Sequence, residues 1–353
     1  MGGETGPIAQ VAAIVSKDLL KWFRWDQIPL KDRNFDCVKA DKHARADKKQ
    51  KHTHPTDVVF FYVDPYLNRR ILFNTDLKSY AVTSMKGPNV RSALRSLAQA
   101  IDCARVSEEW KARYSVEDLD EIRGLLFVYN HDAEYDGDFE RYLLPERRKS
   151  QPGEETADLS SIPLEPGQLL HLIEPRTISY LQTILIDVRK LHMDGMFPSA
   201  NYYFYYPDQK LHKVRLEPHR RPATVESMCG PYLIVGHDPV IKYDESSRQT
   251  DQTCAAGFVV YYNRPGKTHL EFMYLFDVLS SYQILSGEYL VRIRVAHHTP
   301  HAQIQSHFKH AIKAFVQDWG FDDYIEGKLN AIEFEVIDHV KTAFSQTKLG
   351  WDN

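Results

Sequence analysis

The chain has 353 residues, of which 43% are hydrophobic and 26% are charged, and its formal net charge at pH 7 is -4. This length and composition are typical of an ordinary globular protein with room for two domains. The near-neutral charge excludes a uniformly basic protein, so any surface that binds nucleic acid must be local. The first residues lack a secretory signal pattern and no apolar run is long enough to cross a bilayer, which predicts a cytoplasmic protein without membrane contact.

Hydrophobic periodicity predicts alternating helices and strands over the first 130 residues, which together form an α/β sandwich. The apolar positions, turn residues and helix caps predict these elements in chain order: a helix over 7–25, a short strand over 35–38, two strands on either side of a turn at 64–68, a helix over 89–114, a helical segment over 116–122 and a strand over 124–129.

The second half of the chain follows a polar stretch that contains proline and glycine, which predicts a linker over 151–165. Residues 166–353 are predicted to form an α+β domain that serves recognition or partner binding. Its predicted elements are helices over 177–191, 269–285, 300–318 and 325–347, and strands over 202–206, 232–235, 257–262 and 289–296.

Two carboxylates and one lysine gather at the open end of the hairpin formed around the turn at 64–68. Folding the hairpin about the midpoint between Tyr66 and Leu67 places Asp57 opposite Asp76. Directly paired residues share a face of the sheet, and Lys78, two residues beyond Asp76, projects from the same face. This predicts a site that holds a hard divalent cation, Mg²⁺ or Mn²⁺, because such ions prefer oxygen ligands.

The predicted metal ligands are Asp57, Asp76 and the backbone carbonyl of Leu77. A cation held there can lower the pKa of a bound water and offset charge on a phosphate. Lys78 would position the attacking water or stabilise the developing charge beside it. The alternative is a solvated salt bridge on the protein surface, because a pattern as short as D…DxK often occurs by chance.

Asp57 preceded by Pro55 and Thr56, followed by Asp76-Leu77-Lys78 on the next strand, resembles the PD-(D/E)xK nuclease signature. The resemblance covers residues 7–131 and implies a restriction-endonuclease-like αβββαβ core over 1–150. It further implies that Asp57 and Asp76 bind metal and that Lys78 is the catalytic lysine. Many members carry a glutamate on the leading helix, where Gln10 stands in this chain. Gln10 would ligate the metal or orient water without adding charge.

Six basic residues lie upstream of the hairpin and are partly offset by two aspartates. One interpretation is a solvated loop or short helix, because charge runs are most often exposed. The other is an arm that contacts nucleic-acid phosphates as the chain enters the carboxylate hairpin. These residues are Lys39, Lys42, Arg45, Lys48, Lys49 and Lys51.

The cysteines and histidines of the first half give no metal-binding pattern by spacing alone. The four cysteines, Cys37, Cys103, Cys229 and Cys254, are scattered without a CxxC pair, which predicts reduced core thiols instead of a zinc site. His52-Thr53-His54 offers two imidazoles on one face of a strand, but no third ligand is evident in the sequence. A zinc site is therefore not expected.

These observations predict a Mg²⁺-dependent endonuclease that acts on DNA, and the family resemblance makes a role in restriction or anti-phage defence plausible. The alternative is a catalytically inactive nuclease-like module that binds nucleic acid or a partner subunit, because Gln10 replaces a carboxylate. A different phosphoryl-transfer enzyme ranks below both, since no GxxxxGK[ST] loop is present. Any ATPase would be a separate chain, and a homodimer is a further possible assembly.

Overall fold

The computed structural model describes residues 6–43, 52–137, 139, 143, 161–207, 217–244, 249–285, 288–320 and 323–340. Within helices and strands, the side chains of 6–11, 243–244, 249–251 and 319 are outside the described part. The chain divides into an N-terminal unit that includes Met1–Ile178 and a C-terminal unit, Ser179–Val340. Among the described helices, none is both long and apolar enough to span a membrane.

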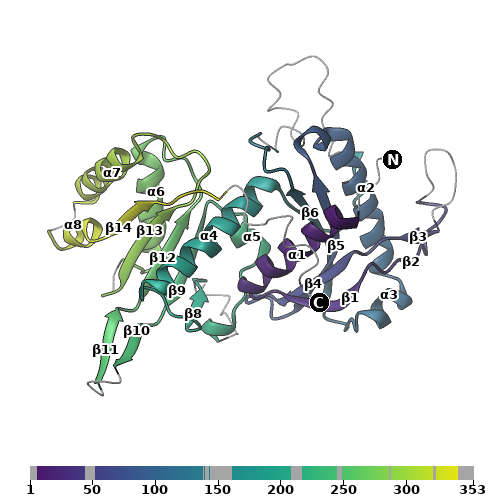
Figure 1. Ribbon diagram of the computed structural model, residues 1–353, viewed down its shortest axis with the longest axis horizontal. Helices are drawn as coiled ribbons and strands as arrows, with labels where there is room; N and C mark the ends of the chain where they lie inside the picture. Colours follow the sequence, from purple (N-terminus) through teal and green to yellow (C-terminus); the bar gives the residue numbers. More distant parts are fainter. Residues whose placement is uncertain are drawn as a thin grey trace, which may run out of the picture. The chain divides into compact units, whose positions relative to one another are not determined.

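The described part of the N-terminal unit alternates helices and strands (Figure 1). Its elements in chain order are α1 (Gly6–Trp22), β1 (Asp26–Lys31), β2 (Phe35–Asp36), β3 (Thr53–His54), β4 (Val58–Val63), β5 (Arg70–Tyr80), the 3-10 turn η1 (Val82–Ser84), α2 (Gly87–Ala104), α3 (Glu108–Arg113), β6 (Glu121–Asn130) and β7 (Leu170–Ile173).

Within the described residues, five strands form the main sheet of this unit in the order β1-β4-β5-β6-β7. β1, β4 and β5 are antiparallel neighbours, whereas β6 and β7 run parallel to β5. With α1 before these strands and α2 between β5 and β6, the order is the predicted αβββαβ core. This confirms the predicted fold class.

The first strand of the core is β1, and the sequence prediction of a strand at 35–38 was wrong in this respect. Pro29 lies inside β1. β1 is the edge strand of the sheet, where a missing N–H disrupts little, so proline is tolerated there. Phe35 and Asp36 form the short β2, which pairs with β3 in a separate two-stranded ribbon.

Helix α2 covers one face of the sheet with the stripe of apolar residues that predicted it. Leu94 and Leu97 pack with Leu126 and Val128 of β6 in one buried cluster. The opposite face of the central strands is buried too, as Phe73 shows. α1 also packs against β5 and β6, so the strands lie between helices as in an α/β sandwich (Figure 1).

Two predicted helical segments in this unit were wrong in extent. The helix predicted over 89–114 is broken between Ala104 and Glu108, where the Ser107 side chain accepts the N–H of Trp110 and caps α3. Serine at this position satisfies a backbone donor that the new helix would leave unpaired. The helical segment predicted over 116–122 is a turn followed by β6, whose parallel pairing with β5 begins at Glu121.

The described part of the C-terminal unit combines helices with a second mixed sheet, as predicted. α4 crosses the boundary between the units. The elements are α4 (Pro175–Met193), β8 (Tyr202–Phe204), the 3-10 turn η5 (Pro218–Arg220), α5 (Val225–Met228), β9 (Tyr232–His237), β10 (Val240–Asp244), β11 (Gln249–Cys254), β12 (Gly257–Tyr262), α6 (His269–Ser281), β13 (Leu290–Val295), α7 (Ile304–Trp319), α8 (Asp323–Asn330) and β14 (Glu333–Val336).

The described strands of this unit form a sheet in the order β14-β13-β12-β9-β8 and a separate β10–β11 hairpin. The helix predicted over 325–347 was wrong beyond Asn330, because residues 333–336 form β14, parallel to β13. The alternation of Glu333 and Glu335 with Phe334 and Val336 has a period of two, which is a strand pattern. Residues 341–347 lie outside the described part.

The boundary between the units lies later in the chain than predicted. The predicted second domain began at 166, but β7 pairs with β6 in the first sheet and the division falls after Ile178. Residues 151–160 of the predicted linker are outside the described part. A four-residue strand such as β7 is decided by its partner strand, which is distant in sequence and invisible to local patterning.

Candidate functional site

The hairpin of β4 and β5 has the register that the sequence predicted. Val58 pairs with Thr75 and Val59 with Asn74, so the next position outward sets Asp57 opposite Asp76. The turn is stabilised by Asp64, whose Oδ1 accepts the N–H groups of Tyr66 and Leu67 at 2.9 and 2.8 Å. This local geometry fixes the pairing of the whole hairpin, since a slip of one residue would reverse every side chain.

Asp57 and Asp76 are held at the mouth of the hairpin by different contacts. Oδ2 of Asp57 accepts the backbone N–H of Leu77 at 2.7 Å, which turns this carboxylate toward β5. Oδ1 of Asp76 lies 2.6 Å from the ammonium of Lys78. Asp76 pairs with Leu126 of β6, and Leu126 packs against α2, so Asp76 and Lys78 lie on the face of the sheet that α2 covers.

The electrostatics of this site are those of two carboxylates with too little positive charge nearby. Burial, followed by the repulsion of Asp76, raises the pKa of Asp57 to about 7. Burial opposes the charged form of Lys78, yet Asp76 and Asp57 together raise the pKa of its ammonium above the ordinary value. A divalent cation between the two carboxylates would relieve their repulsion, so the donor set fits the ion that the hairpin predicts.

Two other predicted site residues are placed only in part. Gln10 lies in α1, and its side chain is outside the described part of the chain. The N–H of Leu77 is bonded to Asp57, and a ligand role for the carbonyl of Leu77 stays a prediction.

The basic arm is divided between described and undescribed residues. Lys39 and Lys42 lie 2.6 and 2.9 Å from the carboxylate of Asp102 on α2. Both ammonium groups therefore form ion pairs with a carboxylate of the protein itself. The remaining members, Arg45, Lys48, Lys49 and Lys51, lie outside the described residues.

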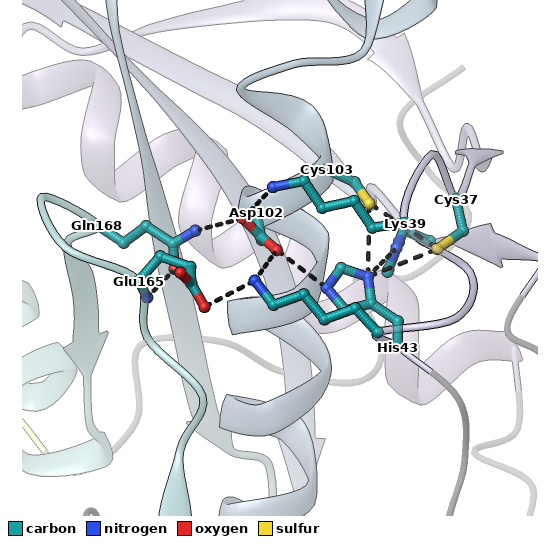
Figure 2. A network of polar contacts seen from close by, with 9 residues as sticks. Cys37, Lys39, His43, Asp102, Cys103, Glu165 and Gln168 are labelled. Carbon is teal, nitrogen blue, oxygen red and sulfur yellow. Dashed lines mark hydrogen bonds and ion pairs between the residues drawn. The ribbon is translucent and has the colours of Figure 1, made fainter. Parts of the chain in front are cut away.

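A second cluster of polar side chains, which sequence spacing did not predict, lies beside α2. Cys37, His43, His54 and Cys103 bring one potential ligand atom each to within 4.8 Å of one another. Figure 2 shows Cys37 and Cys103 directed at one edge of the His43 ring, with Asp102 at the other edge. Cys37 and Cys103 are free thiols, as predicted, but they lie 3.8 Å apart beside two histidines, which their spacing in the sequence did not predict.

The signal for this cluster is present in the sequence but spread over a long interval. Cys37 and His43 are six residues apart, His54 follows eleven residues later, and Cys103 stands on a different element. Only the pairing of β2 with β3 and the packing of α2 unite the four side chains.

One comparison with known proteins identifies the first part of the chain. Residues 1–163 match the family described as GAPS4 protein PD-(D/E)XK nuclease domain. The N-terminal region is a PD-(D/E)XK nuclease domain. The match includes β1 to β6 and ends before β7, and it confirms the resemblance carried by the hairpin. No curated protein and no solved structure gave a match.

The nuclease domain implies a nucleic-acid substrate, and PD-(D/E)XK nucleases typically use divalent metals. The matched range contains Asp57, Asp76 and Lys78, the residues on which the resemblance to the signature was based. The C-terminal unit lies outside the matched residues, so the family says nothing about its role.

Proposed function

We propose that the nuclease domain is a metal-dependent endonuclease that hydrolyses the phosphodiester bonds of DNA. The observation that carries this proposal is the convergence of Asp57 and Asp76 at the hairpin mouth with Lys78 bonded to Asp76. Asp57, Asp76 and the carbonyl of Leu77 would hold Mg²⁺ or Mn²⁺. When bound, such an ion lowers the pKa of water and offsets negative charge on the phosphate.

Lys78 acts in this proposal as a hydrogen-bond donor. Its ammonium lies 2.6 Å from Oδ1 of Asp76. The contact with Asp76 holds the ammonium beside the carboxylates, where it can donate to a phosphate oxygen as negative charge develops. Asp57 is positioned by the N–H of Leu77, which fixes one carboxylate oxygen and orients the other.

The basic arm would supply contacts to the phosphate backbone. Since Lys39 and Lys42 are bonded to Asp102, we assign this role chiefly to Arg45, Lys48, Lys49 and Lys51. Phosphate contacts of this kind position a nucleic acid without reading its sequence. Recognition or binding of a partner subunit would then fall to the C-terminal unit, and restriction or anti-phage defence is the setting that this activity suits.

The activity is tested by incubating the full-length protein with supercoiled plasmid, linear duplex, single-stranded DNA and RNA in Mg²⁺ or Mn²⁺. We expect Asp76→Asn and Lys78→Ala each to lower cleavage by at least about 100-fold, because each removes charge from the reacting centre. Asp277→Asn and Lys313→Ala are the matched controls, since both residues are exposed in the C-terminal unit. Cleavage that persists in the Asp76 and Lys78 variants would contradict the assignment.

A second candidate function is favoured by Gln10, which stands where many family members carry a glutamate on the leading helix. A domain with one carboxylate fewer would bind nucleic acid without cutting it. Salt-sensitive binding that is unchanged by Asp76→Asn, with no cleavage of any substrate in either metal, would support this function over the first. Cleavage that increases in Gln10→Glu would instead show that the site is active and short of charge.

A further inference from the structure

We propose that Cys37, His43, His54 and Cys103 form a structural zinc site in the nuclease domain, separate from the carboxylates at the hairpin mouth. Three of the four side chains are buried and Cys37 is partly buried. The site brings together two thiols and two imidazoles, and all four ligand atoms lie within 4.8 Å of one another. Two cysteines and two histidines are a donor set that zinc takes in closed, four-coordinate structural sites.

Four of the six separations between the ligand atoms match a tetrahedron around zinc, and the other two are within 4.8 Å. With bonds of about 2.3 Å to sulfur and about 2.0 Å to nitrogen, the expected separations are ~3.8 Å for S···S, ~3.3 Å for N···N and ~3.5 Å for S···N. The two Sγ atoms are 3.8 Å apart, and Nδ1 of His43 lies 3.3 Å from Nε2 of His54. The same Nδ1 lies 3.5 Å from each sulfur.

Hydrogen bonding alone does not account for this arrangement. A neutral imidazole nitrogen without a proton offers one lone pair in the ring plane. Nδ1 of His43 is nevertheless approached by three ligand atoms at 3.3 to 3.5 Å. A disulfide is also excluded as the link, because the sulfurs are 3.8 Å apart whereas an S–S bond is about 2.05 Å. A cation at the centre satisfies all four groups at once.

The surroundings of His43 orient it as a metal ligand. Its Nε2 lies 3.1 Å from Oδ2 of Asp102, so an Nε2–H that donates to this carboxylate leaves the lone pair of Nδ1 directed at the cluster (Figure 2). A carboxylate behind a ligating histidine is the usual second contact of a zinc site. Asp102 is fixed in turn by Lys39, Lys42 and Gln168 at 2.6 to 3.1 Å.

This network explains why two lysines of the basic arm contact Asp102. Two thiolates bring two negative charges to the zinc ion, and the carboxylate of Asp102 adds another beside it. Lys39 and Lys42 balance the carboxylate, since their ammonium groups lie 2.6 and 2.9 Å from its oxygens. The lysines are thus part of the support for His43.

The zinc ion would fasten the β2–β3 ribbon to the end of α2. Cys37 follows β2, His54 ends β3, and Cys103 lies in the last turn of α2. His54 precedes Asp57 by three residues, so a metal that fixes His54 also fixes the chain as it enters β4. The ion would add to contacts that already hold the ribbon, since Phe35 of β2 is buried in the cluster that includes Leu72 and Trp110.

The site is tested first on the wild-type full-length protein. After reconstitution with zinc and removal of the excess, mass spectrometry of the metal content should find about one tightly bound zinc ion per chain. X-ray absorption at the zinc edge should find two sulfur neighbours at about 2.3 Å and two nitrogen neighbours at about 2.0 Å. Absence of retained zinc, or a coordination shell made only of oxygen and nitrogen, would overturn the proposal.

Variants assign the ion to these residues. Cys103→Ser should lower the thiolate-to-cobalt charge-transfer absorption of the cobalt-substituted protein by about half or more, because Cys37 is then the one thiolate left, whereas Cys229→Ser, at an exposed cysteine, should retain it. If Cys103→Ser does not fold, Asp102→Asn retains all four ligands and should weaken zinc affinity by roughly 10- to 100-fold. Asp76→Asn should leave zinc content unchanged, and zinc that is lost with Asp76 would place the ion at the hairpin mouth and refute the proposal.

Discussion

Asp57 is the residue whose ionisation the fold opposes most clearly among the predicted site residues. Burial and Asp76 raise the pKa of its carboxyl to about 7, well above the roughly 3.9 of an unfolded chain. Between these two values the folded protein retains a proton that the unfolded protein has lost, so increasing pH favours unfolding. A divalent cation bound between Asp57 and Asp76 would remove the repulsion between them.

Asp57→Asn should therefore raise the free energy of unfolding at pH 8, measured without Mg²⁺ or Mn²⁺, by on the order of 1–3 kcal/mol. The gain should shrink as the pH falls and approach zero below about pH 3, where both folded and unfolded states of the wild type carry the proton. Denaturant titrations across this pH range make the measurement, with Asp277→Asn as an exposed control. Added Mg²⁺ should stabilise the wild type but not Asp57→Asn. A gain that is equal at pH 4 and pH 8 would contradict the carboxylate's raised pKa.

At the scale of elements, the parallel strands β12 and β13 of the C-terminal unit approach each other closely at Gly257. Gly257 pairs with Leu290, and a Cβ at position 257 would lie 2.3 Å from the carbonyl oxygen of Leu290. Backbone atoms in a sheet cannot move aside as a flexible side chain can, so this glycine is required by a close approach. Gly327 in α8 is the opposite case, because a Cβ there would meet no atom within 4 Å.

Gly257→Ala should lower the free energy of unfolding by about 1–3 kcal/mol, since the methyl group forces the two strands apart. Gly327→Ala should raise it by about 0.5–1 kcal/mol, because alanine is the better helix former. Chemical denaturation followed by circular dichroism compares the two with the wild type. Equal effects of the two substitutions would show that β12 and β13 lie further apart than described.

At the scale of the whole molecule, the net charge of -4 means that binding to nucleic acid depends on where the positive charges lie. Lys39 and Lys42 belong to the support of His43 and contribute little to a substrate surface in the proposed arrangement. The contribution of the basic arm should therefore come from the residues between Lys42 and His52. One short run of sequence would therefore serve two purposes, support of His43 by Lys39 and Lys42 and contact with nucleic acid by the residues that follow.

Replacing Lys48, Lys49 and Lys51 together with alanine should weaken DNA binding and reduce the slope of log K against log salt by about 3, since each phosphate contact contributes roughly 0.9. Binding is measured with a fluorescent duplex at several salt concentrations in Ca²⁺ or without a divalent cation. The control replaces Lys17, Lys21 and Lys31, which are exposed in the same domain. An unchanged slope in the first variant would remove the basic arm from the nucleic-acid surface.

The sequence by itself determined the carboxylate hairpin and most of the core around it. The hairpin was predictable because its geometry is local: a turn at Asp64 sets the register, and alternation then decides which side chains meet. Buried helices such as α2 were predictable for the same reason. The ends of elements were less predictable, as the break before α3 and the short strands β1, β7 and β14 show. Such ends depend on helix caps and on partner strands elsewhere in the chain.

Only the tertiary structure decided the second cluster. Cys103 stands 66 residues from Cys37, and no periodicity within either segment points to the other. Their meeting requires β2 to pair with β3 and α2 to pack on the sheet by its apolar stripe, which brings Cys103 to the ribbon. Side chains on separate elements are brought together by packing, which the local spacing of residues does not predict. The carboxylates lie on two strands of one hairpin, and so the sequence alone could place them.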